Sequence, residues 1–198
     1  SFIYRHLLSY AEQWVQWLSA MMRQSLTWVV LGFALLLLIG FGISLLLRHE
    51  QLISGSGIPQ IEAEVGGQLE ENWLRVLWSK MAAGVLAALG GLSLGREGPS
   101  IQLGGMCGKG FGQLFHRVKI EQRYLITCGA AAGLSAAFNA PLAGIMFALE
   151  ELHRSFSMSV IVSVMIASVT GDFLSQYVFG LAPAFHFDVA QTLPLHLY

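Results

Sequence analysis

Hydrophobic and polar positions divide the chain into long apolar segments separated by short polar ones. Residues 28–47 and 124–149 contain no charged side chain, and residues 76–94 contain only Lys80. A further apolar segment spans 158–179. An apolar stretch of about 20 residues is long enough to cross the hydrocarbon core of a bilayer as a helix. The pattern therefore predicts an all-α membrane protein.

Several of the predicted helices are short or interrupted. Glycine, proline or asparagine residues bound four of them, which are expected to begin at Pro59, at Pro99, near residue 124 and at Pro141. Irregular backbone at membrane depth is tolerated where it is buried in protein or lines a polar cavity. We therefore expect about seven to eight helices, several of them partial, in an arrangement typical of transporters.

The two ends of the chain differ from this apolar middle. Residues 1–24 mix aromatic and polar side chains, which is typical of the membrane–water interface, and we expect a helix end and a loop there. Residues 25–180 are expected to hold the membrane helices, and residues 181–198 to form a tail. The polar residues 68–75 and 116–123 are expected to face water.

Small residues recur four positions apart in three of the predicted helices. The three sets are Gly104, Gly108 and Gly112; Gly129, Gly133 and Ala137; and Ala140, Gly144 and Ala148. Such faces let helices pack closely in lipid.

Composition supports a membrane protein and excludes other classes. The 198 residues are 55% hydrophobic and 12% charged, with a net charge of −1, so no nucleic-acid partner is expected. Neither a nucleophile–base pair nor a set of metal ligands occurs at the expected membrane depth. We therefore expect no enzymatic activity, no metal and no organic cofactor.

The stretch Gly95-Arg96-Glu97-Gly98-Pro99 carries the strongest functional signal. Glu97 lies between two apolar segments, and an ionisable residue at membrane depth is by default a candidate functional site. Pro99 suits the first turn of a following helix, whose free N–H groups and positive dipole end would face Glu97 and attract an anion. The residues thus predict a proton-operated plug on an anion site, with Arg96 holding the loop.

A second stretch, Gly55-Ser56-Gly57-Ile58-Pro59, has the same organisation. Glycines free the backbone, Pro59 begins a helix, and the Ser56 hydroxyl has one hydrogen to donate to an anion. The alternative interpretation is that Ser56 only caps the helix. Two such loops in one short membrane chain favour anion binding.

These stretches, with the segment from Gly129 to Glu151 (GAAAGLSAAFNAPLAGIMFALEE), resemble the CLC family of chloride channels and proton/chloride antiporters. The resemblance extends from about Trp28 to about Tyr177. It implies a CLC-type bundle of tilted, partial and broken helices, one of two inverted halves, which transports chloride and protons. It also implies a homodimer, with helices 141–152 and 158–179 at its interface, in a multi-pass protein of the cell (inner) membrane.

The resemblance also implies roles for individual residues. Glu97 would be the external gating and proton glutamate, and Glu151 the internal proton glutamate. The anion-binding residues would be Ser56, Gly57, Ile58 and Gly98. Without the resemblance, Glu150 and Glu151 would be read as solvated carboxylates that end a membrane helix. With it, Glu151 becomes functional and Glu150 stays structural.

One departure from the family concerns the third filter motif. No Gly-x-Phe-x-Pro sequence occurs after residue 160. We therefore expect the chain to be a partial CLC membrane domain that belongs to a longer transporter.

The expected function is proton-coupled chloride antiport gated by Glu97. The alternative within the family is a passive voltage- or pH-gated chloride channel, against which the acid at Glu151 argues. The alternative from another class is a non-conducting membrane scaffold, which would have no need of two glycine-flanked loops that each open a helix.

Overall fold

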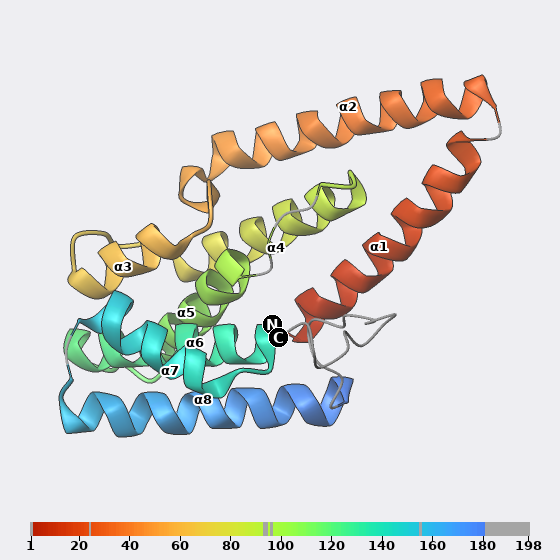
Figure 1. Cartoon of the computed structure of the whole chain (residues 1–198). Coiled ribbons are helices and arrows are strands. Elements are labelled where there is room, and N and C mark those ends of the chain that lie inside the picture. Colours follow the sequence, from red (N-terminus) through yellow and green to blue (C-terminus); the bar gives the residue numbers. More distant parts are fainter. Residues whose placement is uncertain (1, 24, 93–94, 96, 155, 181–198) are drawn as a thin grey trace, which may run out of the picture.

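The structure, a computed structural model, describes residues 2–23, 25–92, 95, 97–154 and 156–180. Within these residues the chain is helical and contains no strand, which confirms the all-α prediction (Figure 1). The elements are α1 (Phe2–Met22), α2 (Leu26–His49), η1 (Gln51–Ile53), α3 (Ile58–Gly66), α4 (Trp73–Leu89), α5 (Glu97–Leu114), α6 (Lys119–Phe138), α7 (Pro141–Phe147), η2 (Ala148–His153) and α8 (Met158–Phe179).

Helices α5 and α6 form the centre of the bundle (Figure 1). On one side α5 packs against α4, which in turn contacts α1 and α2. On the other side α6 packs against α7 and α8. The short helix α3 contacts both central helices. The two central helices therefore position the loops that precede α3 and α5.

The contact between α5 and α6 is made through backbone atoms. A Cβ atom on Gly104 would overlap the carbonyl oxygen of Gly129, and one on Gly129 would overlap that of Gly104. One turn further on, a Cβ on Gly108 would overlap the carbonyl oxygen of Leu125. The predicted small-residue faces are thus confirmed for this pair of helices, because only glycine permits so close an approach.

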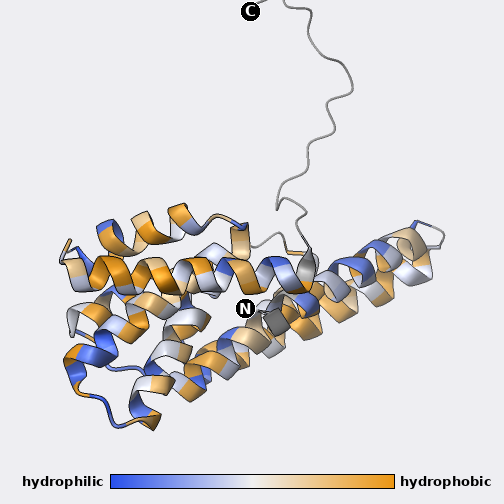
Figure 2. Ribbon diagram, turned by 90° about the horizontal axis from the view of Figure 1, so that it is seen from below, coloured by the Kyte–Doolittle hydropathy of each residue, from blue (hydrophilic) through white to orange (hydrophobic). Residues whose placement is uncertain are grey.

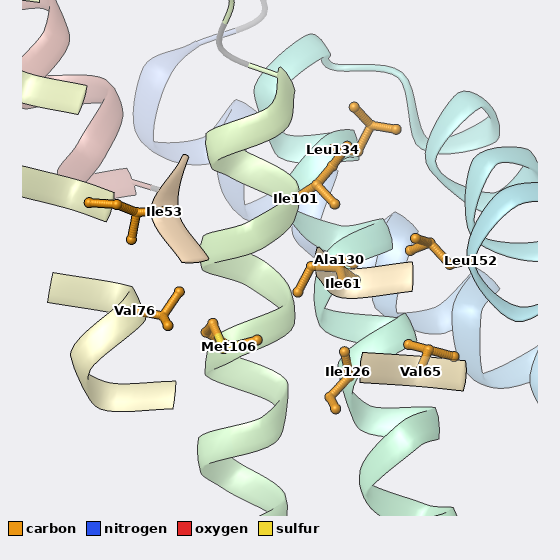
Figure 3. Close-up of a cluster of buried hydrophobic side chains, with 10 residues drawn as sticks. All are labelled: Ile53, Ile61, Val65, Val76, Ile101, Met106, Ile126, Ala130, Leu134 and Leu152. Atoms are coloured by element: carbon orange, nitrogen blue, oxygen red, sulfur yellow. The ribbon is translucent and has the colours of Figure 1, made fainter. Parts of the chain in front are cut away.

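A cluster of buried apolar side chains joins these central helices to the segments around α3 (Figure 3). Its members are Ile53, Ile61, Val65, Val76, Ile101, Met106, Ile126, Ala130, Leu134 and Leu152. Ile53 lies just before the Ser56 loop and Ile61 just after it, and Ile61 is fully buried. Both ends of that loop are therefore held by packing against the core.

In the described part of the chain, two helices are long and apolar enough to cross a membrane: Leu26–His49 and Met158–Val178. They agree with the predicted segments 28–47 and 158–179. Ser25 sets the start of α2, because its side chain accepts a hydrogen bond from the Thr27 amide at 3.2 Å. Hydrophobic residues dominate the long helices, whereas hydrophilic residues gather in the connecting loops (Figure 2).

The expectation for residues 1–24 was wrong in one respect. The segment forms one continuous helix from Phe2 to Met22 instead of a helix end and a loop. Tyr4, Leu8 and Ala11 are buried at helical spacing, and the first two pack with residues of α4. This packing stabilises a helix whose mixed aromatic and polar sequence obscured its period.

Some predicted boundaries were also displaced. Helix α4 begins at Trp73, inside the predicted polar loop, because the Asn72 side chain accepts a hydrogen bond from the Arg75 amide at 3.3 Å. Helix α5 begins at Glu97 instead of Pro99, so the glutamate belongs to its first turn. Helix α6 likewise begins earlier than predicted, at Lys119. The predicted tail, residues 181–198, lies outside the described residues.

Candidate functional site

The two glycine-flanked loops line one cavity of about 550 Å³. The predicted site residues on its wall are Gly55, Ser56, Ile58, Gly95, Glu97, Gly98 and Pro99. Helix α4 contributes Lys80 to the same wall. Gly57 lies in the first loop, and Pro59 lies in the first turn of α3. Arg96 lies outside the described residues.

The loops touch through their backbones. A Cβ atom on Gly98 would overlap the carbonyl oxygen of Ser56, so the first turn of α5 rests directly on the first loop. Gly98 is buried, while Ser56 and Glu97 are exposed toward the cavity that both line. Glycine is required at position 98, because any side chain would separate the two loops.

The first loop owes its shape to two glycines with left-handed backbone conformation. The φ angles are 69° at Gly55 and 91° at Gly57. Between them, the Ser56 Oγ accepts a hydrogen bond from the Ile58 amide at 3.3 Å. Gly57, and not Ser56, holds the N-cap position of α3. Ser56 therefore supports the turn with its oxygen while its hydroxyl hydrogen remains available to an anion.

Four consecutive carbonyl oxygens, those of residues 52–55, accept hydrogen bonds from side chains. The Lys80 Nζ donates to the carbonyl oxygens of residues 53 and 55 at 2.8 Å each. The Gln102 Nε2 donates to the carbonyl oxygen of residue 52 at 3.0 Å, and the Gln60 Nε2 donates to that of residue 54 at 2.9 Å. These carbonyl dipoles point toward donors, so their negative ends are not left to repel an anion at Ser56.

The charge distribution of the cavity favours an anion. The N-terminal residues of α3 and α5, Ile58 and Glu97, both lie on its wall, and helix N-termini carry a partial positive charge. Lys80 adds a positive charge, and among the described residues that line the cavity Glu97 is the one carboxylate. A mobile anion and the Glu97 carboxylate would therefore be drawn to the same place.

Sequence reasoning missed the three side chains that hold the first loop. Lys80 was noted only as the exception in an apolar segment, although a lone charge at membrane depth is itself a functional signal. Gln60 and Gln102 carried no such signal, because a glutamine in a helix is usually an ordinary polar residue. Their roles depend on contacts that no local pattern specifies.

Glu151 lies on a different element from the cavity. It belongs to η2, a π-helical turn that follows α7, and its side chain is exposed, as is that of Glu150. The neighbouring Leu149 and Leu152 are buried and fix the turn against the bundle. Single π-helical turns are rare and are frequently found at functional sites. The structure does not bring Glu151 into the cavity that Glu97 lines.

Long and broken helices whose ends meet at one charged cavity are an arrangement typical of membrane transport proteins. The chain belongs to the voltage-gated chloride channel family, which matches residues 34–198. The predicted membership of the CLC family is therefore confirmed.

Two curated relatives and one solved structure illustrate the similarity. The chain is 38% identical over 180 residues to the H+/Cl− exchange transporter ClcA of Vibrio cholerae serotype O1, covering 88% of this chain. It is 42% identical over 173 residues to ClcA of Cronobacter sakazakii, covering 85% of this chain. The crystal structure of a slow cyanobacterial Cl−/H+ antiporter superposes with a TM-score of 0.81 over 98% of this chain, at 33% identity.

The similarity covers only part of each of these proteins. The matched region is 38% of the V. cholerae transporter, 33% of the C. sakazakii transporter and 46% of the cyanobacterial antiporter. The chain thus spans less than half the length of the relatives it matches.

Proposed function

We propose that the chain forms the first part of a proton-coupled chloride transporter. The observation that carries this proposal is the cavity at which the Ser56 loop meets the N-terminus of α5, with four carbonyl oxygens turned toward side-chain donors. The two relatives named H+/Cl− exchange transporters and the antiporter structure support the same assignment.

Chloride would bind between the two loops. The Ser56 hydroxyl donates a hydrogen bond to it, and the backbone at Gly57, Ile58 and Gly98 forms the remaining contacts from this chain. Lys80 contributes an attractive charge from the cavity wall. A weakly hydrated monovalent anion suits such a site, because it needs several neutral donors and no dedicated charged partner.

Glu97 would couple anion binding to proton binding. Its ionised carboxylate and chloride compete for the same positive end of α5, since two anions close together repel each other. A proton neutralises Glu97, and the neutral side chain leaves the site to chloride. Binding of one ion therefore changes the affinity for the other, which is the linkage that proton/chloride exchange requires.

Glu151 would deliver protons from the inner side. Its exposed carboxylate on η2 can exchange protons with water and pass them toward Glu97 along a transient water path. No metal or organic cofactor takes part in this scheme. The protein would act as a homodimer in the cell (inner) membrane, crossing it several times.

The test is a paired measurement of chloride and proton flux from liposomes that contain the full-length protein. We expect an imposed chloride gradient to move protons against their own gradient. Glu97→Ala should retain chloride flux but lose proton movement, and Glu151→Gln should lose proton movement as well. Glu150→Gln is the matched control and should behave as the parent. Chloride flux without proton movement in the parent would show a passive channel, and no flux at all would favour a scaffold.

A further inference from the structure

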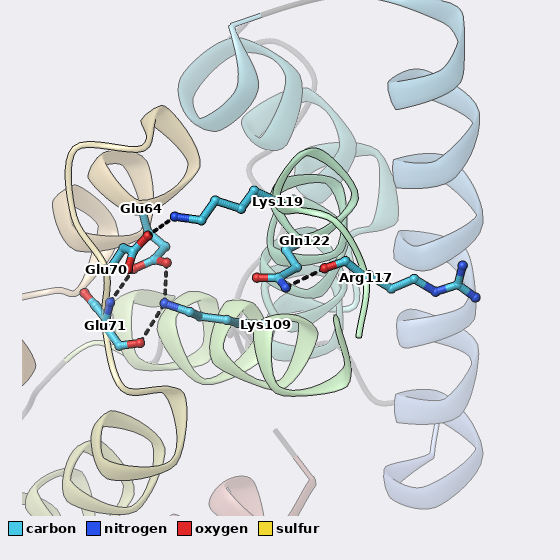
Figure 4. A network of polar contacts seen from close by, with 7 residues as sticks. All are labelled: Glu64, Glu70, Glu71, Lys109, Arg117, Lys119 and Gln122. Carbon is cyan, nitrogen blue, oxygen red and sulfur yellow. Dashed lines mark hydrogen bonds and ion pairs between the residues drawn. The ribbon is translucent and has the colours of Figure 1, made fainter. Parts of the chain in front are cut away.

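A second group of buried charges lies outside the anion cavity, where α3, the loop after it and α5 meet (Figure 4). Glu64, Glu71 and Lys109 are only 7%, 3% and 4% exposed. The Lys109 ammonium pairs with the Glu64 carboxylate and donates to the backbone carbonyl of Glu71 at 2.6 Å. The second oxygen of Glu64 accepts a hydrogen bond from the Glu71 amide at 2.7 Å. Lys109 and Glu64 therefore satisfy each other, and they hold the backbone of Glu71.

The side chain of Glu71 is left out of this pairing. Both of its carboxyl oxygens are buried and make no hydrogen bond of regular geometry with the described residues. An unpaired buried carboxylate is costly, so the neutral form is favoured. Burial, and then repulsion from Glu64, raise the pKa of Glu71 to about 7, against the smaller opposing attraction of Lys109. The charge of Glu50, at the end of α2, pushes in the same direction as Glu64.

Protons can reach Glu71 from the surface. A cavity of about 610 Å³ is lined by Glu71, Glu64 and Lys109 and extends to Glu70 and Lys119. Glu70 and Lys119 form an ion pair at 2.5 Å, and their side chains are 73% and 80% exposed. Because its rim residues face solvent, this cavity leads from solvent to the residues around the buried Glu71 carboxyl group. Arg123 also lines it and adds a positive charge.

Glu71 is also coupled to the anion site. Its charge acts on Lys80, and the Gln102 side chain interacts with its carboxyl group. These two residues donate the hydrogen bonds that hold three of the four carbonyl oxygens of residues 52–55. A charge on Glu71 therefore acts on the same lysine that makes the anion cavity positive.

We propose that Glu71 is a proton-binding residue that adjusts the chloride affinity of the Ser56 loop through Lys80. When Glu71 is neutral, the Lys80 charge is unopposed and chloride binds more tightly. When Glu71 is ionised, it offsets part of that charge and chloride binds more weakly. By reciprocity, bound chloride favours protonation of Glu71. This inference rests on the proposed function, because it takes the cavity at Ser56 to be a chloride site.

The experiment measures chloride affinity by calorimetric titration of the full-length protein in detergent. The parent for this test carries Glu97→Gln, which removes the carboxylate that competes with chloride directly. We expect chloride to bind at least about twofold more tightly at about pH 5.5 than at about pH 7.5, the range in which Glu71 changes its charge. Adding Glu71→Gln should give tight, pH-independent binding. Adding Glu70→Gln, the exposed neighbour in the same loop, should leave the pH dependence unchanged.

A second measurement reports the proton itself. Infrared spectroscopy should show a carboxylic-acid C=O band that titrates near neutral pH and is absent from the Glu71→Gln protein. Chloride should shift the midpoint of this band to higher pH. Binding that does not change with pH, or a pH dependence that survives Glu71→Gln, would overturn the inference alone. Absence of chloride binding at both pH values would overturn it together with the proposed function.

Discussion

The ammonium nitrogen of Lys80 lies 2.8 Å from the carbonyl oxygen of Gly55, the residue before the serine predicted to bind chloride. The same nitrogen lies 2.8 Å from the carbonyl oxygen of Ile53. Lys80 is only 4% exposed, so water cannot take its place on these carbonyls. One side chain of α4 thus fixes the backbone of the first loop and places a positive charge beside the anion cavity.

Replacing this lysine should weaken chloride binding. Lys80→Met keeps the length of the side chain but removes its charge and leaves the carbonyls of Ile53 and Gly55 without this donor. The first loop loses two hydrogen bonds to a charged group, each worth about 1.5–3 kcal/mol of stability, and the cavity loses a positive charge. We therefore expect chloride affinity to fall at least about tenfold, which corresponds to about 1.4 kcal/mol. Calorimetric titration of the full-length protein checks this. Lys119→Met, at an exposed lysine, is the control, and an unchanged affinity in Lys80→Met would show that the lysine has only a packing role.

The backbone contact between α5 and α6 predicts that replacing glycine with alanine changes the stability of the protein in opposite directions at two positions. Gly104→Ala places a methyl group against the Gly129 carbonyl oxygen and should destabilise the protein by about 1–3 kcal/mol. Gly40→Ala, in α2, meets no atom within 4 Å. It should be neutral or stabilising by up to about 1 kcal/mol, because alanine favours helix over glycine. Unfolding in detergent compares them, and equal effects would contradict the close contact.

Glu71 should make the stability of the protein depend on pH. Its folded-state pKa, about 7, lies above the ordinary value of 4.5, so the folded protein holds a proton that the unfolded chain releases. Stability therefore falls as pH rises from about 4.5 to about 7, by an amount on the order of 3 kcal/mol. Melting temperatures at about pH 5 and about pH 8 measure this loss.

Two variants separate Glu71 from its neighbour in that measurement. Glu71→Gln should remove most of the difference between the two pH values. Glu70→Gln should retain it, because a hydrogen bond from Lys119 and the charge of that lysine lower the pKa of Glu70, so this carboxylate takes up no proton on folding. If both variants keep the full difference, another group is responsible for it.

The outer face of α8 should carry the dimer contact that the family resemblance implies. Met165 and Val169 are exposed there, whereas Ile145 and Leu149 of the preceding turns are buried inside the chain and cannot contribute. Met165→Trp should disrupt close packing between protomers and give monomers by chemical cross-linking in detergent. Leu37→Trp, on the exposed surface of α2, is the control. Cross-linked dimers at the parent level in Met165→Trp would place the interface elsewhere.

Local patterns were enough to predict most of the helices. Apolar runs predicted α2 and α8, because a membrane helix needs little besides length and hydrophobicity. The glycine spacing in α5 and α6 also predicted a close helix contact, since small residues four apart share one face. Helix α1 was only partly predicted, because few of its positions are buried and aromatic residues lie on several faces.

The contacts that build the candidate site could not be predicted in the same way. Lys80 and Gly55 are 25 residues apart, Gln102 and Leu52 are 50 apart, and Lys109 and Glu64 are 45 apart. Each depends on how separate helices are arranged in space. The sequence indicated the two glycine-flanked loops, because a loop motif is local, but not the side chains that hold them.

The glycine contacts have a mechanical consequence. Where Gly104 meets Gly129, and where Gly98 meets Ser56, carbonyl and α-carbon atoms already touch. Neither partner can slide or tilt past the other without a collision, and no flexible side chain is present to absorb the movement. The backbone around the anion cavity should therefore stay rigid while ions move through it. Alternating access on its two sides would depend on swinging side chains such as Glu97, and not on a rocking motion of α5 against α6.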